Sequence, residues 1–170
     1  EKIYLWNELR FEYYSGRSFL CLCLPEKAYI EICNVYDCLP SSLVMVLLKN
    51  NNNVLPLDKT KYGAFMVAGP TAASLDALLG NYHGVSSKAV NFVEGITAAA
   101  GPGTRVEYDQ GCDYIDTVHF GGTWAAGNAD ITIAVIGLTP VYEGEEGDAF
   151  LAPGGGDKTT ISLPASHIAY

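Results

Sequence analysis

Four carboxyl side chains lie within six residues of one another, in the segment EGEEGD. They are Glu143, Glu145, Glu146 and Asp148. Like charges held close together make each carboxyl harder to ionise, so at least one of the four is expected to keep its proton near neutral pH. A protonated carboxyl in such a loop can serve as a general acid. A solvated acidic loop with no chemical role is the alternative that these residues leave open.

A buried strand is predicted directly before this acidic loop. Its apolar residues are Ile131, Ile133, Val135, Ile136 and Leu138. A run that is apolar on both faces and rich in β-branched residues is typical of an inner strand of a covered parallel sheet. Gly137 and Pro140 end the strand, so the four carboxyls follow its carboxyl end, which is where open α/β sheets bind their ligands.

Two more strands and a helix are predicted upstream. Residues 62–68 and 104–108 have the pattern of short strands. Residues 72–79 carry leucines at helical spacing, and Thr71 is expected to cap that helix before Gly80 ends it.

A second helix is predicted over residues 90–100. Val93, Ile96 and Thr97 are expected to face the core, because they recur at the spacing of one helix face. Gly101 lies just beyond the end of this helix, where glycine is favoured.

The remaining segments are less regular. Asn50–Asn53 predicts a turn, because asparagine tolerates left-handed backbone. Residues 111–128 read as an irregular stretch, with Ala125 and Ala126 its one indication of helix, and a last helix is expected to begin after Leu163-Pro164. The order β-α-β-β-α predicts a partial α/β sandwich with a mainly parallel sheet covered by helices, truncated at the C-terminus. About half of such a sheet would be present, which would leave an unpaired inner strand edge prone to aggregation.

Composition narrows the class of protein. The chain has 170 residues, 49% hydrophobic and 17% charged, which describes a globular domain. Its net charge of −9 argues against a nucleic-acid partner, because an acidic chain repels phosphates. No apolar run reaches the roughly 18 residues that cross a bilayer. Residues 19–24 are too short, and lie too far inside the chain, for a signal peptide.

Metal and nucleotide sites find little support. Cys21, Cys23, Cys33 and Cys38 do not match zinc spacings, and Cys112 reads as a small buried hydrophobe. His83 is expected to be structural or exposed. The remaining candidates are the glycine segments 101–103 and 154–156 and a calcium loop over 143–148. The glycines lack the strand-to-helix context of a phosphate loop, and the carboxyls lack the alternating spacing of calcium loops. No cofactor is therefore expected.

The first forty residues differ in texture from the rest. They are dense in aromatic residues and cysteine and contain a single glycine, Gly16. From residue 41 onward, apolar runs alternate with glycine, proline and asparagine. We therefore predict a boundary there, with residues 1–40 either a poorly ordered appendage or a segment foreign to the ancestral domain, and residues 41–170 the first part of the domain.

The domain resembles the middle, α/β sandwich domain of glycoside hydrolase family 3, in its bacterial β-glucosidase and β-xylosidase branch. The resemblance spans about residues 41–168 and keeps one order of motifs: LLKNNNNVLPL (47–57), MVAGPTAASLDALLGNYHG (66–84), VEGI (93–96), DQGCD (109–113), IGLTPVYEGEEGD (136–148) and GGDKTTISLP (155–164). Residues 1–40 match nothing in the family, where a (β/α)8 barrel is expected upstream. The resemblance implies that the chain is a fragment.

The resemblance also implies an activity and its residues. The family hydrolyses terminal β-linked sugars with retention, which needs a nucleophile and an acid/base carboxyl about 5–5.5 Å apart. The nucleophile is an aspartate of the barrel, which this sequence lacks. Aligning the family's Ser-Gly-Glu-Gly-x-Asp-Arg with this loop places the acid/base at Glu145. Glu146 stands where the family has a glycine, which leaves the alignment ambiguous by one residue. Glu146 is therefore the competing candidate for the acid/base.

The same alignment assigns the neighbouring positions. Glu143 is a candidate contact to a sugar hydroxyl and a third acid/base candidate, and Asp148 matches the family's aspartate. Ala149 stands where relatives carry an arginine that would pair with the loop's acids. The implied substrate is a β-linked glucoside or xyloside, and full-length relatives are often secreted or periplasmic. A non-catalytic carbohydrate-binding or interaction module is the alternative, and the isolated chain is expected to be inactive without its barrel.

Overall fold

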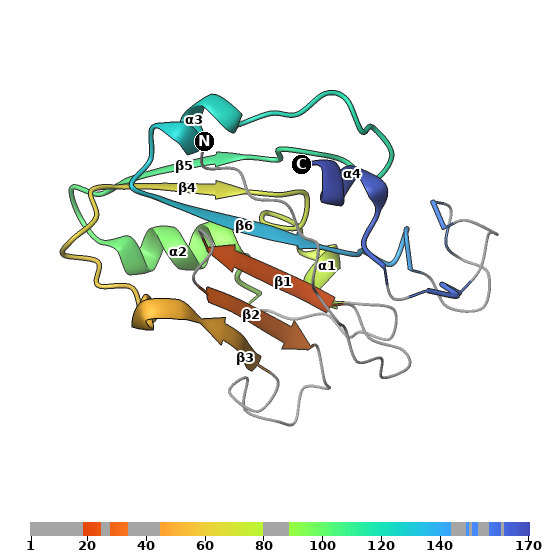
Figure 1. The fold of residues 1–170 in the computed structure, drawn as a ribbon, viewed down its shortest axis with the longest axis horizontal. Coiled ribbons are helices and arrows are strands. Elements are labelled where there is room, and N and C mark those ends of the chain that lie inside the picture. The colour runs from red at the N-terminus through yellow and green to blue at the C-terminus, as the bar shows by residue number, and fades with distance from the viewer. Residues whose placement is uncertain are drawn as a thin grey trace.

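The computed structural model describes residues 19–24, 28–33, 45–79, 89–143, 149, 151–152, 157–160 and 162–170. Their strands form one six-stranded sheet in the order β3-β2-β1-β6-β4-β5 (Figure 1). Half of the sheet is parallel and comes from the domain predicted over 41–170, and the other half is antiparallel.

The parallel half consists of β4 (Ala64–Ala68), β5 (Arg105–Asp109) and β6 (Ile131–Gly137). β4 lies in the middle and pairs in parallel with both neighbours. Val67 and Val135 are fully buried at its centre, so the prediction of a covered parallel sheet is confirmed.

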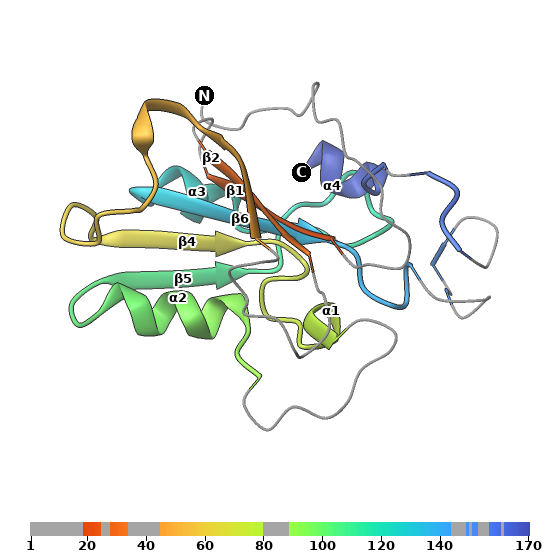
Figure 2. The ribbon, with the colours of Figure 1, turned by 90° about the horizontal axis from the view of Figure 1, so that it is seen from below.

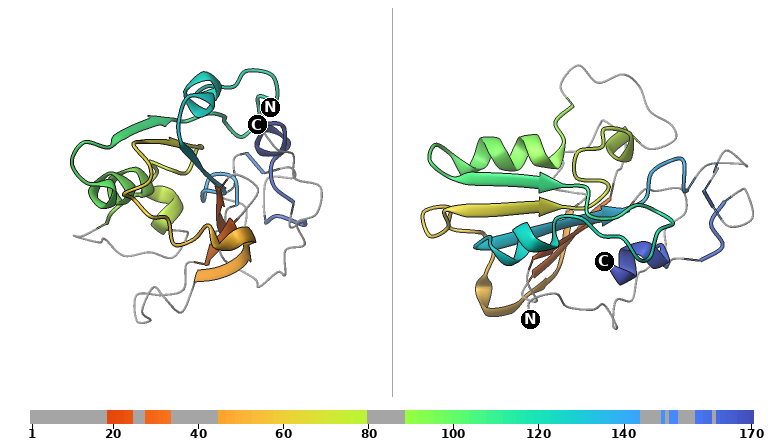
Figure 3. Two further views of the ribbon diagram at one scale, coloured as in Figure 1. Left: turned by 60° about the vertical axis from the view of Figure 1, so that its left-hand side comes forward. Right: turned by 90° about the horizontal axis from the view of Figure 1, so that it is seen from above.

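Helices α1 (Asp76–Leu79) and α2 (Phe92–Ala100) lie on one side of these strands (Figures 2 and 3). Asn91 and Glu94 form a reciprocal capping box, which explains why α2 begins at Phe92, two residues later than predicted. Val93 and Ile96 pack on the core as expected. Thr97 is exposed, so its predicted inward position is wrong.

The first helix is shorter than predicted. It begins at Asp76 instead of residue 72, and Ser74 accepts the hydrogen bond of the Ala77 amide. Thr71 does not cap it, because its hydroxyl donates to the carbonyl of Val135 at 2.9 Å. A tertiary contact has replaced the local cap.

The opposite face of the sheet carries α3 (Thr123–Gly127), the helix indicated by the alanine pair. Thr132 on β6 donates its hydroxyl hydrogen bond to the carbonyl of Ala126. A Cβ at Gly122, just before α3, would lie 2.7 Å from the Met66 methyl. Because Phe65 and Val67 belong to the core cluster on the other side, β4 is covered on both faces.

The antiparallel half consists of β1 (Phe19–Leu24), β2 (Ala28–Cys33) and β3 (Met45–Asn50). β1 pairs antiparallel with β6, from Leu20 opposite Gly137 to Cys23 opposite Ala134. The predicted open edge on β6 is therefore wrong, because an N-terminal strand covers it. The domain boundary near residue 41 stays a prediction.

The asparagine turn follows β3 as η2 (Asn51–Asn53), and Asn52 and Asn53 adopt positive φ, as predicted. Asn50 bonds Leu55 through both its amide nitrogen and its oxygen. No helix in the described ranges has the length and apolar character to span a membrane.

Candidate functional site

The carboxyl ends of β4, β5 and β6 lie at the same edge of the sheet, because the three strands are parallel (Figure 2). The segments that leave this edge begin at Gly69, Gln110 and Leu138. This is the edge at which open α/β sheets bind ligands, and α4 (Ala165–Ala169) lies beside it (Figure 1).

The turn after β4 is wedged between the neighbouring strands. Gly69 has φ +128° and donates its amide hydrogen bond to the Asp109 carbonyl at 3.2 Å. A Cβ at this position would lie 1.9 Å from the carbonyl oxygen of Val135. The chain therefore needs glycine here, and the base of the site is closely packed backbone.

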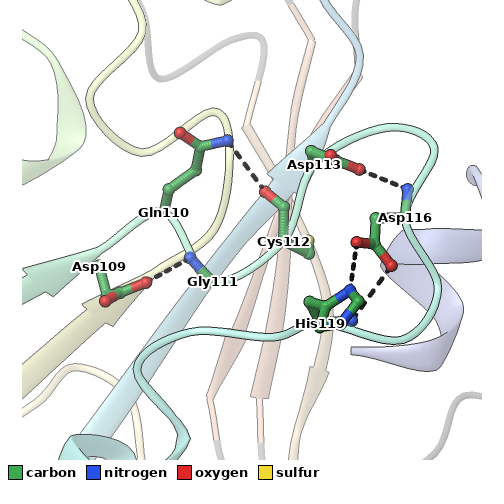
Figure 4. Close-up of a pocket in the computed structure, with 7 residues that line it drawn as sticks. All are labelled: Asp109, Gln110, Gly111, Cys112, Asp113, Asp116 and His119. Atoms are coloured by element: carbon green, nitrogen blue, oxygen red, sulfur yellow. Dashed lines mark hydrogen bonds and ion pairs between the residues drawn. The ribbon is translucent and has the colours of Figure 1, made fainter.

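The loop after β5 surrounds an open pocket of about 300 Å³ (Figure 4). Its lining residues are Asp109, Gln110, Gly111, Cys112, Asp113, Asp116 and His119. Asp109 accepts a hydrogen bond from the Gly111 amide at 2.7 Å, and the Gln110 amide group donates to the carbonyl of Cys112. These bonds fix the start of the loop.

The next two aspartates fold the loop back on itself. Asp113 accepts from the amides of Ile115 and Asp116, and Asp116 accepts from those of Val118 and His119. The Nδ1 atom of His119 also lies 2.7 Å from Oδ2 of Asp116, within hydrogen-bond distance (Figure 4). The Val118 amide, the His119 ring and the His119 amide, in that order, lower the pKa of Asp116. These carboxylates serve the loop's own backbone, and no described group of three or more His, Cys, Asp or Glu could hold a metal.

Cys112 is buried under this loop, with 4% of its surface exposed. Burial, and then the charge of Asp113, raises the pKa of its thiol to about 12. A thiol that stays protonated is a poor nucleophile. The prediction of a small buried hydrophobe is confirmed.

Helix α4 and the C-terminal tyrosine pack onto the same loop. The Tyr170 hydroxyl donates to the Gly121 carbonyl at 3.3 Å, and a Cβ at Gly111 would lie 2.4 Å from the tyrosine ring. A Cβ at Gly121 would lie 2.3 Å from the Asp109 carboxylate. Gly111 therefore lets the C-terminal tyrosine approach the loop closely, and Gly121 lets the loop lie against the end of β5.

An aromatic layer, defined here as Tyr114, Tyr142 and His167, joins the loop after β5, the loop after β6 and α4. Tyr114 stacks on Tyr142 with ring centroids 5.4 Å apart, and its ring lies 5.0 Å from that of His167. His167 is 2% exposed, and burial lowers its pKa to about 4. The layer fixes the residue that precedes Glu143.

Glu143 is the described member of the acidic loop. Its amide and that of Tyr142 both donate to the carbonyl of Thr139 at 2.9 Å, which anchors the turn after β6. The side chain is half-buried, and burial raises the pKa of its carboxyl; Lys158 opposes this effect and Asp157 adds to it. The predicted direction is right for this residue, although burial rather than clustered charge is the main cause.

Other predicted site residues lie outside the described residues: Glu145, Glu146, Asp148, His83 and the glycine triplet 154–156. Ala149 is described and is buried, with 1% of its surface exposed. The cation that acts on Glu143 is instead Lys158, nine residues further along the chain. Sequence reasoning missed Lys158, Tyr114 and His167, although the first lies in the motif GGDKTTISLP.

A parallel sheet that is covered by helices and followed by loops at its carboxyl edge defines an α/β domain. Residues 45–169 match the family described as Glycosyl hydrolase family 3 C-terminal domain. The chain belongs to this family, as its motifs predicted.

Curated relatives carry β-xylosidase names. A "Beta-xylosidase" of Formosa agariphila is 34% identical over 114 residues, which cover 61% of this chain and 16% of the relative. "Beta-D-xylosidase 3" of Arabidopsis thaliana is 30% identical over 122 residues, covering 71% and 14%. "Beta-xylosidase/alpha-L-arabinofuranosidase 1" of Medicago sativa is 31% identical over 115 residues, covering 65% and 14%. The chain thus spans about one seventh of their length. No solved structure is a significant match.

Proposed function

We propose that this chain supplies the acid/base loop of a retaining exo-β-glycosidase that removes terminal β-linked xylose or glucose. The general acid in this proposal is Glu145. Family membership and the β-xylosidase names of its relatives support the reaction class and favour xylose.

One structural observation carries the proposal: the position and environment of Glu143. This carboxyl lies at the carboxyl edge of the sheet, on a backbone held by Thr139, and burial raises its pKa. Glu145 follows two residues later on the same loop. Carboxyls with raised pKa values in such places are candidates for acid/base chemistry.

The reaction needs a second carboxyl from another domain. In a retaining mechanism a carboxylate attacks the anomeric carbon while the acid protonates the leaving oxygen. We assign the nucleophile to a (β/α)8 barrel that packs against this edge. Its charge would raise the pKa of the Glu145 carboxyl before glycosylation. Once the glycosyl ester has formed, that charge is gone, and Glu145 accepts the proton of the water that attacks it.

Two neighbours take binding roles in this proposal. Glu143 and Asp148, two residues before and three residues after the proposed acid in the sequence, accept hydrogen bonds from sugar hydroxyls. No metal or cofactor takes part in this scheme, since proton transfer and covalent catalysis by two carboxyls complete the reaction.

A hybrid enzyme tests the assignment. Residues 45–169 replace the matching segment of the Formosa agariphila β-xylosidase, and hydrolysis of aryl β-xylosides with good and poor leaving groups is measured. We expect Glu145→Gln to slow the poor leaving group about 10²–10⁴-fold, which is the usual worth of general acid catalysis, and the good one far less. Glu146→Gln is the matched control and keeps the parent's rates.

Two results overturn the proposal. An active Glu145→Gln with an inactive Glu146→Gln moves the acid by one residue. A hybrid that binds xylosides without hydrolysing them, with the parent relative active, identifies a non-catalytic binding module instead.

A further inference from the structure

We propose that Lys158 is a positioning residue of this site, which ties the segment entering the acidic loop to the segment leaving it and holds Glu143 in place. The sugar-binding role of Glu143 rests on the proposed function. The tie itself follows from contacts of the described residues.

The first contact is with the segment that leaves the loop. The Lys158 ammonium donates a hydrogen bond to the carbonyl of Ser162, four residues further on. The hydroxyls of Thr160 and Ser162 lie 2.9 Å apart within the same turn. Ser162 comes shortly before α4, so the lysine is joined to the start of that helix.

The second contact is with the segment that enters the loop. The Lys158 ammonium lies 5.9 Å from the centroid of the Tyr142 ring, within the range of a cation–π interaction. Tyr142 is itself 9% exposed and stacks on Tyr114. A ring that is held in this way is a fixed support for the ammonium group.

These contacts close a circuit. Tyr142 stacks on Tyr114, and Tyr114 contacts His167 of α4. Ser162, in the segment just before α4, accepts the hydrogen bond of Lys158. The two aromatic contacts and the Lys158–Tyr142 contact join segments that are far apart in the sequence, whereas the bond from Lys158 to Ser162 spans four residues. These contacts link Tyr142, the residue before Glu143, to α4 and to Lys158.

The charges of Lys158 and Glu143 also act on each other. Lys158 lowers the pKa of Glu143 against the effect of burial, and Glu143 raises the pKa of Lys158 against the same effect. The two residues therefore support each other's ionised state. Asp157, the other named charge, acts on Glu143 in the opposite direction.

A titration of the 170-residue chain tests this inference without any hydrolysis. The pKa of the Glu143 carboxyl is measured by ¹³C NMR in the parent and in Lys158→Met, which keeps an apolar stem but loses the charge. We expect the pKa of Glu143 to rise in Lys158→Met, because the positive charge that lowers it is removed. Lys158→Arg is expected to restore a value close to that of the parent.

Lys61→Met is the matched control. Lys61 is an exposed lysine that pairs with Asp58 at 3.6 Å, in the turn before β4. Its loss is expected to leave the pKa of Glu143 unchanged. If Lys158 acted only by packing its aliphatic stem, Lys158→Met would also leave the pKa of Glu143 unchanged. That result would overturn the inference.

A second measurement covers the case in which Lys158→Met does not fold. In the unmodified chain, the ¹⁵N shift of the Lys158 ammonium is followed through the titration of Glu143. A step at the pKa of Glu143 supports the pair, and a flat response refutes it. Because neither readout involves catalysis, an active Glu145→Gln hybrid would reject the proposed function and leave this result standing.

Discussion

The His167 ring lies 5.0 Å from that of Tyr114, and neither of its ring nitrogens has a hydrogen-bond partner among the described residues. The imidazole is thus held as a neutral ring in an apolar setting. Burial is the main reason for its low pKa; Asp113 works against burial, and Lys158 works with it. Protonation would place a charge without a described hydrogen-bond partner on the buried face of α4.

We predict that His167 makes the fold acid-labile. Its pKa is about 4 in the folded chain, against 6.5 for an unperturbed histidine. A pKa depressed on folding means that the stabilisation is complete above the unfolded pKa and is lost as the pH falls from 6.5 toward 4. The loss between pH 7 and pH 5 is about 2 kcal/mol. Urea midpoints of the parent and of His167→Phe at both pH values measure it.

The control is His119→Gln, at a histidine whose side chain is 85% exposed. Because its ring pairs with Asp116 at 2.7 Å, this variant measures what that exposed pair adds to the pH dependence, which is then separated from the effect of His167. If His167→Phe loses as much stability between pH 7 and pH 5 as the parent does, the carboxylates and not His167 cause the acid lability.

We predict that Cys112 resists alkylation in the folded chain. With a pKa of about 12, its thiolate fraction at pH 8 is about one in ten thousand, and the sulfur is covered. Iodoacetamide treatment followed by peptide mass spectrometry should find Cys112 unmodified in buffer and modified in urea. Rapid modification of this peptide in buffer would contradict the buried position.

Gly69→Ala should unfold the chain or cost about 3 kcal/mol or more, because the new Cβ would meet the backbone of Val135 and the backbone has φ +128°. Gly127→Ala is the matched control, since a Cβ there meets nothing within 4 Å. Circular dichroism melting compares the two variants. A Gly69→Ala chain as stable as Gly127→Ala would show that the turn after β4 is not wedged as described.

Sequence patterns predicted the elements whose signals are local. β6 follows from its apolar run, and α2 follows from the spacing of its apolar residues and from Gly101 beyond its end. The start of α1 was missed because Thr71 bonds Val135, a partner that no local pattern reveals. The pairing of β1 with β6 is likewise long-range.

The parts of the candidate site that could be predicted are likewise those with local sequence signals. The acidic loop was found because its carboxyls are neighbours in the sequence, whereas the aromatic layer joins three separate segments. The importance of Lys158 follows only from its interactions with Tyr142, Glu143 and Ser162, which the sequence does not reveal. Contacts of this kind depend on how the loops pack.

The 170-residue chain alone is predicted to leave aryl β-xylosides and aryl β-glucosides intact, because the nucleophile of the proposed mechanism lies on another domain. Release of 4-nitrophenol, with the hybrid enzyme as the positive control, measures this. Hydrolysis by the purified chain that survives Glu145→Gln would mean that a different site carries the activity.

The proposed role of Glu145 is tested most directly by the product that the Glu145→Gln hybrid forms in azide with an aryl β-xyloside bearing a good leaving group. Azide needs no general base, so it should restore turnover and yield β-xylosyl azide, with retained configuration, as seen by ¹H NMR. Xylose as the sole product, at a rate that azide does not change, would contradict the assignment of the acid/base to this residue.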